Sequence, residues 1–174
     1  IVADKGCLKL HRLSDRICAA GAGTSAACDE LTRITALKLE TQLMQQRQRR
    51  GSTGSSSSSR SGAHGHAPRD PSPRLSAVAR MLSREMRAED YGSAFLVGGA
   101  DDAGSGLFVV TPEGAYEQVP FAAVGSGMGP AASELVGRYR PDMDEEEACR
   151  LVADAVRCGI TEDLGRGSFL RLWI

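Results

Sequence analysis

The chain alternates between strand-like and helix-like patterns of apolar residues, and their order predicts an α+β domain. Residues 7–13 alternate apolar and polar side chains, and residues 17–22 are small and mostly apolar. These two patterns predict strands joined by a turn at residues 14–16. From Thr24 the spacing becomes helical, and we expect a long helix to about Gln46. The chain is thus predicted to open with a β-hairpin followed by a helix.

The predicted first helix has an amphipathic pattern. Its apolar face would consist of Ala27, Leu31, Ile34 and the aliphatic stem of Lys38. A second helical pattern runs over residues 75–86, and the Ser72–Pro73 pair before it is typical of a helix start. We expect the two helices to pack side by side.

The period of apolar residues returns to that of strands after residue 93. We expect strands at 94–97, 107–110, 115–119, 122–124 and 169–174, the first three of them forming an antiparallel meander. Two helices follow residue 129. The last helix has acids at 144–147, which favour the positive end of the helix dipole, and Gly159 is predicted to stop it. Strand groups and helix pairs in this order predict a layered domain.

Residues 47–74 form a tract rich in Arg, Ser, Gly and Pro, with five consecutive serines at 55–59. Such a tract has almost no apolar surface to offset the entropy of ordering it, so we expect a disordered insertion between two helices. Its basic bias also suits RNA or an acidic protein surface, although no aromatic residue is present to stack on a base.

The composition sets limits on the class of protein. With 174 residues, 41% hydrophobic and 25% charged, the chain suits one cored domain, and its net charge of −1 provides no global field for nucleic acid or anionic lipid. No apolar run approaches the ~20 residues of a membrane span. These properties predict a soluble intracellular protein without a membrane partner.

The cysteines and histidines give weak signals. Five cysteines without a C-x-x-C pair argue against a disulfide framework and a zinc site, so we expect reduced thiols. His64 and His66 form an H-x-H pair that could contact a metal, or simply belong to the polar loop. We expect no cofactor and no structural metal.

Several motifs together resemble one protein family. They are VADK at 2–5, CLKLH at 7–11, AGAGT at 20–24, VGSGMG at 124–129, RPDMDEEEA at 140–148 and GITEDLG at 159–165. The chain is similar in these segments to proteasome beta-type subunits, and most similar to the trypsin-like catalytic type. The resemblance implies a four-layer αββα sandwich of the N-terminal nucleophile hydrolase class. Residues 1–174 would form a single partial domain of this kind, truncated at both ends.

The resemblance assigns catalytic roles to four residues. Lys9 matches the lysine that lowers the proton affinity of the nucleophile, and Gly23 the residue whose backbone N–H binds the oxyanion. Ser126 and Asp163 match the pair beside the catalytic amine. Without the resemblance, the local sequence predicts that Lys9 is a solvent-exposed strand residue and that Asp163 caps a turn.

The resemblance also implies a pocket for the substrate side chain, formed by Gly21, Asp29, His11 and Ser25. Glycine at position 21 would leave the pocket deep, and Asp29 would favour Arg or Lys, which implies cleavage after basic residues. Considered alone, Gly21 and Gly23 suit a tight turn, and Asp29 suits the first turn of a helix.

Members of the family use an N-terminal threonine as nucleophile, and the resemblance places that threonine before Ile1. No internal threonine can replace it, because its own amine is the general base. The chain as given is therefore not expected to be active alone. Arg166 stands where the family has a serine near this amine.

Two functions follow as hypotheses from the resemblance. The first is a threonine-type endopeptidase subunit of the proteasome, in a heptameric ring with other beta subunits, next to alpha subunits, and acting on polypeptides in cytoplasm and nucleus. The alternative is a non-catalytic structural or assembly subunit of the ring. A third hypothesis, an RNA- or acidic-protein-binding module, would rest on Arg47 to Arg74.

Overall fold

The computed structural model describes residues 8–52, 72–88 and 91–162. In chain order the elements are β1 (Leu10–Arg12), β2 (Ile17–Ala22), α1 (Ser25–Ser52), α2 (Leu75–Ala88), β3 (Ala94–Asp101), β4 (Gly104–Val110), β5 (Tyr116–Gln118), α3 (Met128–Arg138) and α4 (Glu145–Glu162). The predicted hairpin, meander and helix pairs are therefore all present. Residues 122–124, predicted as a strand, are not in a strand, and the predicted strand at 169–174 lies outside the described residues.

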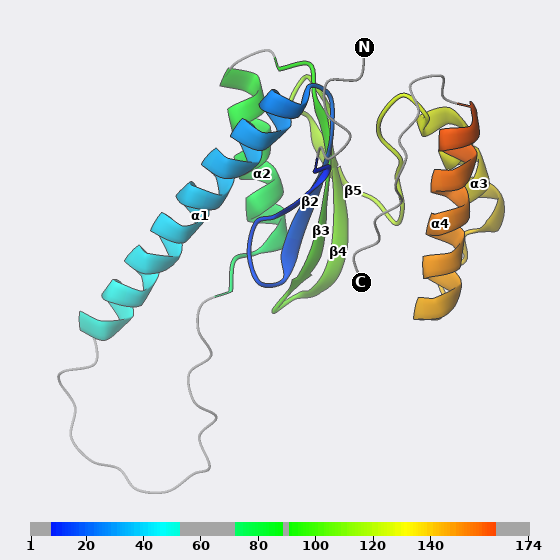
Figure 1. Cartoon of the computed structure of the whole chain (residues 1–174). Helices are drawn as coiled ribbons and strands as arrows, with labels where there is room; N and C mark the ends of the chain where they lie inside the picture. The colour runs from blue at the N-terminus through cyan, green and yellow to red at the C-terminus, as the bar shows by residue number, and fades with distance from the viewer. Residues whose placement is uncertain (1–7, 53–71, 89–90, 163–174) are drawn as a thin grey trace, which may run out of the picture.

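The sheet has the order β1-β2-β3-β4-β5, with every neighbouring pair antiparallel. Helices α1 and α2 are inserted between β2 and β3 and cover one face of it (Figure 1). That face carries the main core, in which Ile17, Ala19, Phe95, Val97 and Val110 pack against Leu31, Leu39, Val78 and Leu82. Burial of large side chains on one face of a sheet is the main source of stability in such a layer.

Helix α1 differs from its prediction in length and in its buried face. It continues past Gln46 to Ser52, so the first residues of the predicted insertion are helical. The buried side includes Leu31 and Leu39, whereas Lys38 is exposed. The prediction that the stem of Lys38 packs on the core was wrong, because its ammonium bonds the carboxylate of Glu85 on α2 instead (Nζ–Oε1 2.6 Å).

Helix α2 begins at Leu75 and not at the Ser72–Pro73 pair. The N–H of Leu75, the first of the helix, donates a hydrogen bond to Oδ2 of Asp101 at the end of β3 (2.7 Å). Asp101 is distant from Leu75 in sequence. The other oxygen of Asp101 accepts a bond from the Ala103 N–H (2.7 Å). A single carboxylate thus ties the start of α2 to the β3–β4 turn and satisfies an otherwise unpaired helix donor.

These bonds make the stability of this junction depend on pH. The N–H groups of Leu75 and Ala103 hold the pKa of the Asp101 carboxyl below its ordinary value. A carboxyl with a lowered pKa in the folded state stabilises that state above the pKa of the unfolded chain, and the effect is lost as pH falls through the folded pKa.

We expect Asp101→Ala to lower the melting temperature of the complete gene product at pH 7, and the difference from wild type to shrink below about pH 4. Asp102→Ala is the matched control, because Asp102 is the neighbouring exposed carboxylate in the β3–β4 turn. Melting curves at several pH values measure both variants. Equal losses for the two variants at pH 7 would contradict the capping role.

Helices α3 and α4 pack on each other, on the opposite side of the sheet from α1 and α2 (Figure 1). A second core of Ala131, Leu135, Leu151 and Ala155 lies between them, with Phe121 and Tyr139 against it. Helix α4 passes through Gly159 to Glu162, so the prediction that Gly159 stops the helix was wrong. Gly159 instead lies in close backbone contact with Gly127 at the start of α3.

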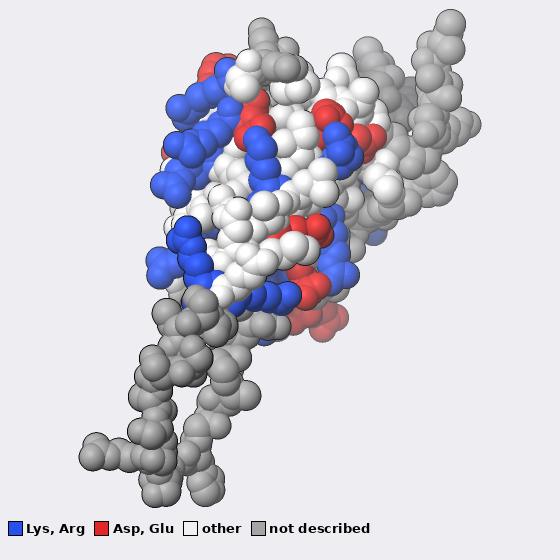
Figure 2. Space-filling model, turned by 90° about the vertical axis from the view of Figure 1, so that its left-hand side faces the viewer, with Lys and Arg blue, Asp and Glu red and all other residues white. Residues whose placement is uncertain are grey.

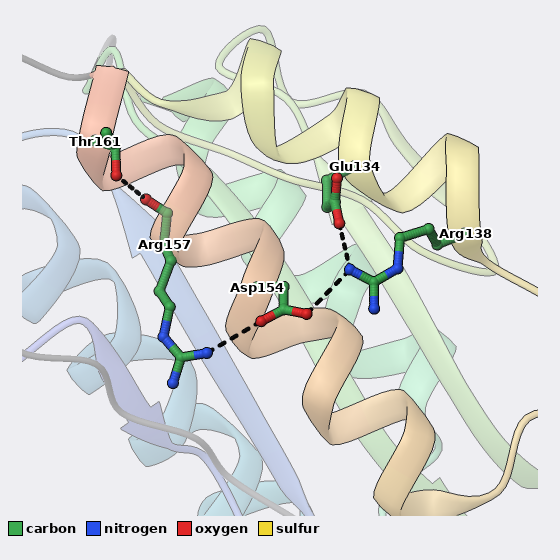
Figure 3. A network of polar contacts seen from close by, with 5 residues as sticks. All are labelled: Glu134, Arg138, Asp154, Arg157 and Thr161. Atoms are coloured by element: carbon green, nitrogen blue, oxygen red, sulfur yellow. Dashed lines mark hydrogen bonds and ion pairs between the residues drawn. The ribbon is translucent and has the colours of Figure 1, made fainter.

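Charged side chains also join these two helices (Figure 3). Arg138 of α3 bonds Glu134 on its own helix and Oδ2 of Asp154 on α4 (3.0 Å), and Arg157 bonds Oδ1 of Asp154 (3.0 Å). The hydrogen bond from Arg138 is the main cause that holds the pKa of Asp154 below its ordinary value. Exposed ion pairs are individually weak, but this network fixes the register of α3 against α4.

The described residues contain neither a cluster that could hold a metal nor a helix that could span a membrane. Within them, no three His, Cys, Asp or Glu side chains lie close enough together to hold a metal ion. The described helices also include none with the length and apolar character that a bilayer crossing requires.

Candidate active site

The site predicted from sequence is centred on the end of β2, where the chain turns into α1. Gly23 has φ of +151°, a conformation that residues with a side chain rarely adopt, and a Cβ placed on it would lie 2.3 Å from Oγ of Ser93. Ser93 is fully buried, and its hydroxyl bonds the Tyr91 carbonyl (3.2 Å). Only glycine therefore fits position 23, and its backbone is exposed to solvent beside the sheet.

Gly21 is buried under the first turn of α1. A Cβ at this position would meet Sγ of Cys28 at 2.8 Å and Cε1 of Phe95 at 2.9 Å. The N–H of Gly21 donates to the carbonyl of Lys9 (2.9 Å), and the Lys9 side chain is exposed. The absent side chain at position 21 thus lets α1 approach the sheet, and the proposed role of Gly21 as a pocket floor stays a prediction.

His11 and Asp29 are brought together by this packing. His11 lies on β1 opposite Ala19, and its Nδ1 is 3.7 Å from Oδ1 of Asp29 on α1. The side chain of His11 is 12% exposed, that of Asp29 is 61% exposed, and the buried Nε2 of His11 has no hydrogen-bond partner among the described residues. Ser25 is the exposed first residue of α1, one turn before Asp29. A carboxylate held open beside an imidazole can bind a cationic side chain.

The turn that carries Ser126 reaches the same end of β2. Gly125 has φ of +108°, and a Cβ on it would lie 3.6 Å from Cβ of Ala22, which is ordinary van der Waals contact. Ser126 follows and is exposed. The structure therefore brings the loop of Ser126 next to the β2–α1 turn of Gly23, although about 100 residues separate them in sequence.

The position of that turn is set by a contact between two glycines. A Cβ on Gly127 would lie 2.7 Å from the carbonyl oxygen of Gly159, and one on Gly159 would lie 2.9 Å from the carbonyl oxygen of Gly127. The start of α3 and the last turns of α4 therefore touch through their backbones. Asp163 directly follows α4, and it lies outside the described residues, as does Arg166.

Sequence reasoning missed three residues that shape this site. The side chain of Ser93 packs against the turn at Gly23, and the backbone contact between Gly127 and Gly159 positions the loop of Ser126. Ser93 gives no local signal, because it precedes an ordinary strand. The sequence shows that positions 127 and 159 are glycines, but it does not indicate that they touch, because that contact depends on how α3 packs on α4.

Comparison with known proteins identifies the family. Residues 60–174 match the proteasome subunit family. The chain is 35% identical over 169 residues to proteasome subunit beta type-10 of Mus musculus, covering 96% of this chain and 54% of that protein. It is 33% identical over 170 residues to probable proteasome subunit beta type-2 of Schizosaccharomyces pombe, covering 97% of this chain and 55% of the relative. It is 32% identical over 170 residues to proteasome subunit beta type-2 of Saccharomyces cerevisiae, covering 97% of this chain and 56% of the relative.

The chain belongs to the proteasome subunit family, and within that family to the beta-type subunits. The family has the N-terminal nucleophile hydrolase fold, so the predicted fold class is confirmed, and the α+β layering agrees with it. The chain spans about half the length of the curated relatives it matches.

Proposed function

We propose that the complete protein is a threonine-type endopeptidase subunit of the proteasome that cleaves polypeptides after Arg or Lys. The observation that carries this proposal is the pair of His11 and Asp29, in which the Asp29 side chain is 61% exposed on the helix that follows the Gly23 turn. A guanidinium or ammonium bound at Asp29 would set the adjacent peptide bond of the substrate near that turn.

The backbone and side chains would then divide the work of peptide cleavage. The N–H of Gly23 would donate to the oxygen that becomes negative in the tetrahedral intermediate. Lys9 would stabilise the deprotonated nucleophile, which the resemblance assigns to a threonine N-terminal to Ile1. Ser126 would assist proton transfer at the amine of that threonine, with Asp163 orienting it.

The same proposal includes the setting in which the subunit works. It would occupy a heptameric beta ring beside other beta subunits, next to alpha subunits, and degrade proteins in the cytoplasm and nucleus. A non-catalytic ring subunit is the second candidate function, and Arg166 favours it, because a bulky cation in place of a serine would crowd a catalytic amine.

The role of Asp29 is tested with Asp29→Asn in the complete gene product, isolated in assembled particles. We expect the ratio of cleavage after Arg to cleavage after Leu to fall about fivefold, because a half-exposed ion pair is worth about 1 kcal/mol. Asp29→Glu is the matched control and should retain most of the preference, since it keeps the charge. Paired fluorogenic peptides measure the ratio.

The two candidate functions predict different results in this assay. An intact particle that contains the wild-type subunit but shows no cleavage assignable to it would support the non-catalytic role. A subunit that cleaves with an Arg preference unchanged by Asp29→Asn would refute the pocket and leave the peptidase role standing.

A further inference from the structure

Two acidic side chains follow each other near the start of α1, and they have different partners. The carboxylate of Asp29 lies beside the imidazole of His11 (Oδ1–Nδ1 3.7 Å), and the Asp29 side chain is 61% exposed. The carboxylate of Glu30 accepts two hydrogen bonds from the guanidinium of Arg33 (Nε–Oε2 3.0 Å and Nη2–Oε1 2.8 Å). One acid is therefore open to solvent, whereas the other is bound to a cation of its own helix.

Arg33 is within reach of both acids. It lies three residues after Glu30 and four residues after Asp29, and both spacings bring side chains together on the surface of an α-helix. An acid placed four residues before a cation is in the favourable orientation for an ion pair. Among the ion pairs of the described residues, however, Arg33 pairs with Glu30, and none joins Arg33 to Asp29. The two parallel bonds to Glu30 fix the guanidinium in a different place.

The lack of a basic partner sets Asp29 apart. Figure 2 shows the face that α1 and α2 cover, where most acidic side chains lie next to Lys or Arg side chains. In the described part of the chain, Asp29 has no Lys or Arg within ion-pair distance. The hydrogen bonds from Arg33 hold the pKa of Glu30 below its ordinary value, so Glu30 stays ionised at neutral pH and retains Arg33. A cationic ligand of Asp29 therefore has no Lys or Arg of the described chain to displace.

We propose that Glu30 is a positioning residue for the substrate pocket: it binds Arg33, keeps this cation away from Asp29, and so leaves Asp29 free for the basic side chain of the substrate. The inference rests on the proposed cleavage after Arg or Lys. Without Glu30, Arg33 would pair with Asp29 and compete with the substrate for the same carboxylate. Glu30 acts through Arg33 and does not itself touch the substrate.

Two other roles of Glu30 predict different results. As a plain surface ion pair, Glu30 and Arg33 would only support α1, and their removal would leave the cleavage specificity unchanged. As a second acid of the pocket, Glu30 would bind the substrate directly, and removal of Arg33 would not compensate for the loss of Glu30. The direct role suits the geometry less well, because both oxygens of Glu30 already bind a guanidinium.

The test uses the complete gene product in assembled particles and fluorogenic peptides that end in Arg or in Leu. We expect Glu30→Ala to raise KM for the Arg peptide about twofold, the strength of a favourable pair at this helical spacing, and to leave kcat unchanged. KM for the Leu peptide should not change. The double variant Glu30→Ala with Arg33→Ala should return KM for the Arg peptide to the wild-type value. Alanine favours helix, so α1 should remain folded in both variants.

Glu40→Ala is the matched control, because it removes another acid with an exposed side chain from the same helix. Glu40 lies about 15 Å further along the helix than Glu30, which exceeds the Debye length at physiological ionic strength. KM for the Arg peptide should not change in this control. An unchanged KM in Glu30→Ala, a rise that the double variant does not reverse, or an equal rise in Glu40→Ala would overturn the proposal.

Asp29→Asn in the same assay separates failure of this inference from failure of the proposed function. If Asp29→Asn lowers the preference for Arg and Glu30→Ala does not, the pocket stands and the role of Glu30 is refuted. If Asp29→Asn leaves the preference unchanged, the pocket itself is refuted, and the role of Glu30 with it.

A structure of the particle that carries Glu30→Ala tests the inference without any measurement of activity. We expect the guanidinium of Arg33 to lie within hydrogen-bond distance of the Asp29 carboxylate in this variant. An Arg33 side chain that stays away from Asp29 would overturn the proposal, whatever the peptidase activity of the particle.

Discussion

Replacing Gly127 by valine should push α3 away from α4 and lower the free energy of unfolding by about 2 to 3 kcal/mol. A Cβ at this position would lie 2.7 Å from the carbonyl oxygen of Gly159 and 2.9 Å from its C and Cα atoms. All three are backbone atoms, so no side-chain rotation can relieve the contact. Because Ser126 is the preceding residue, peptide cleavage should fall with stability. Denaturant unfolding and peptidase assays on the complete gene product measure the two effects.

Two other glycines of α3 provide the controls for this prediction. Gly129 and Gly137 have open space where a Cβ would be placed. Alanine there should be neutral or stabilising by about 0.5 to 1 kcal/mol, because glycine is a poor helix former. The backbone of Gly127 itself has φ of −86°, which suits any residue, so strain in that angle cannot explain a loss. A Gly127→Val variant as stable as Gly129→Ala would contradict the interlock of the two helices.

Replacing Gly23 by alanine should lower the free energy of unfolding by about 2 kcal/mol and abolish most peptide cleavage. The new Cβ would lie 2.3 Å from Oγ and 2.8 Å from Cβ of Ser93, which is fully buried and cannot move outward. The turn would have to shift, and with it the N–H proposed to bind the oxyanion. Thermal unfolding and the rate of cleavage per particle are the measurements.

Gly104→Ala separates the cost of a side chain at positive φ from the cost of the contact with Ser93. Gly104 also has a positive φ, +127°, but its Cβ position is open, so its substitution measures the backbone cost alone. The double variant Gly23→Ala with Ser93→Gly removes the two closest contacts and should recover part of the stability. If Gly104→Ala cost as much as Gly23→Ala, and the double variant recovered nothing, the wall formed by Ser93 would not be the cause.

The elements that local patterns determine were predictable from sequence. The alternation at residues 7–13, the small residues at 17–22 and the three segments of the meander all gave strands near their predicted positions. The helical spacing of 75–86 likewise gave α2. In β2 and α2 one face is buried along the whole element, so the spacing of the apolar residues is enough to predict the strand and the helix. Strand β5 is exposed throughout, and its alternating pattern predicted it without burial.

What the sequence could not supply depends on contacts between distant segments. The start of α2 is set by Asp101, which is 26 residues away, and a local capping pattern pointed to Ser72 instead. The sequence predicted that Gly159 ends the last helix, because glycine is common just after helix C-termini. In the structure, the missing side chain of Gly159 lets the backbone of Gly127 approach α4. The buried side of α1 also depends on where the sheet and α2 lie, which no single helix pattern encodes.

The candidate site was predicted in part. The resemblance already named Gly21, Gly23, Asp29, His11 and Ser126. The structure places Nδ1 of His11 3.7 Å from Oδ1 of Asp29, and the turn of Ser126 beside Ala22. The chemical roles came from the resemblance and remain predictions, because the bare pattern suited a tight turn and a helix start equally well.

We propose that this chain is part of a catalytic beta-type subunit whose threonine nucleophile lies N-terminal to Ile1. The most direct test is the N-terminal sequence and intact mass of the mature subunit, isolated from assembled particles after labelling with an electrophilic peptide that ends in Arg. We expect the mature subunit to begin with a threonine upstream of residue 1 and that threonine to carry the label. A mature subunit in the particle that begins with another residue and takes no label would contradict the claim.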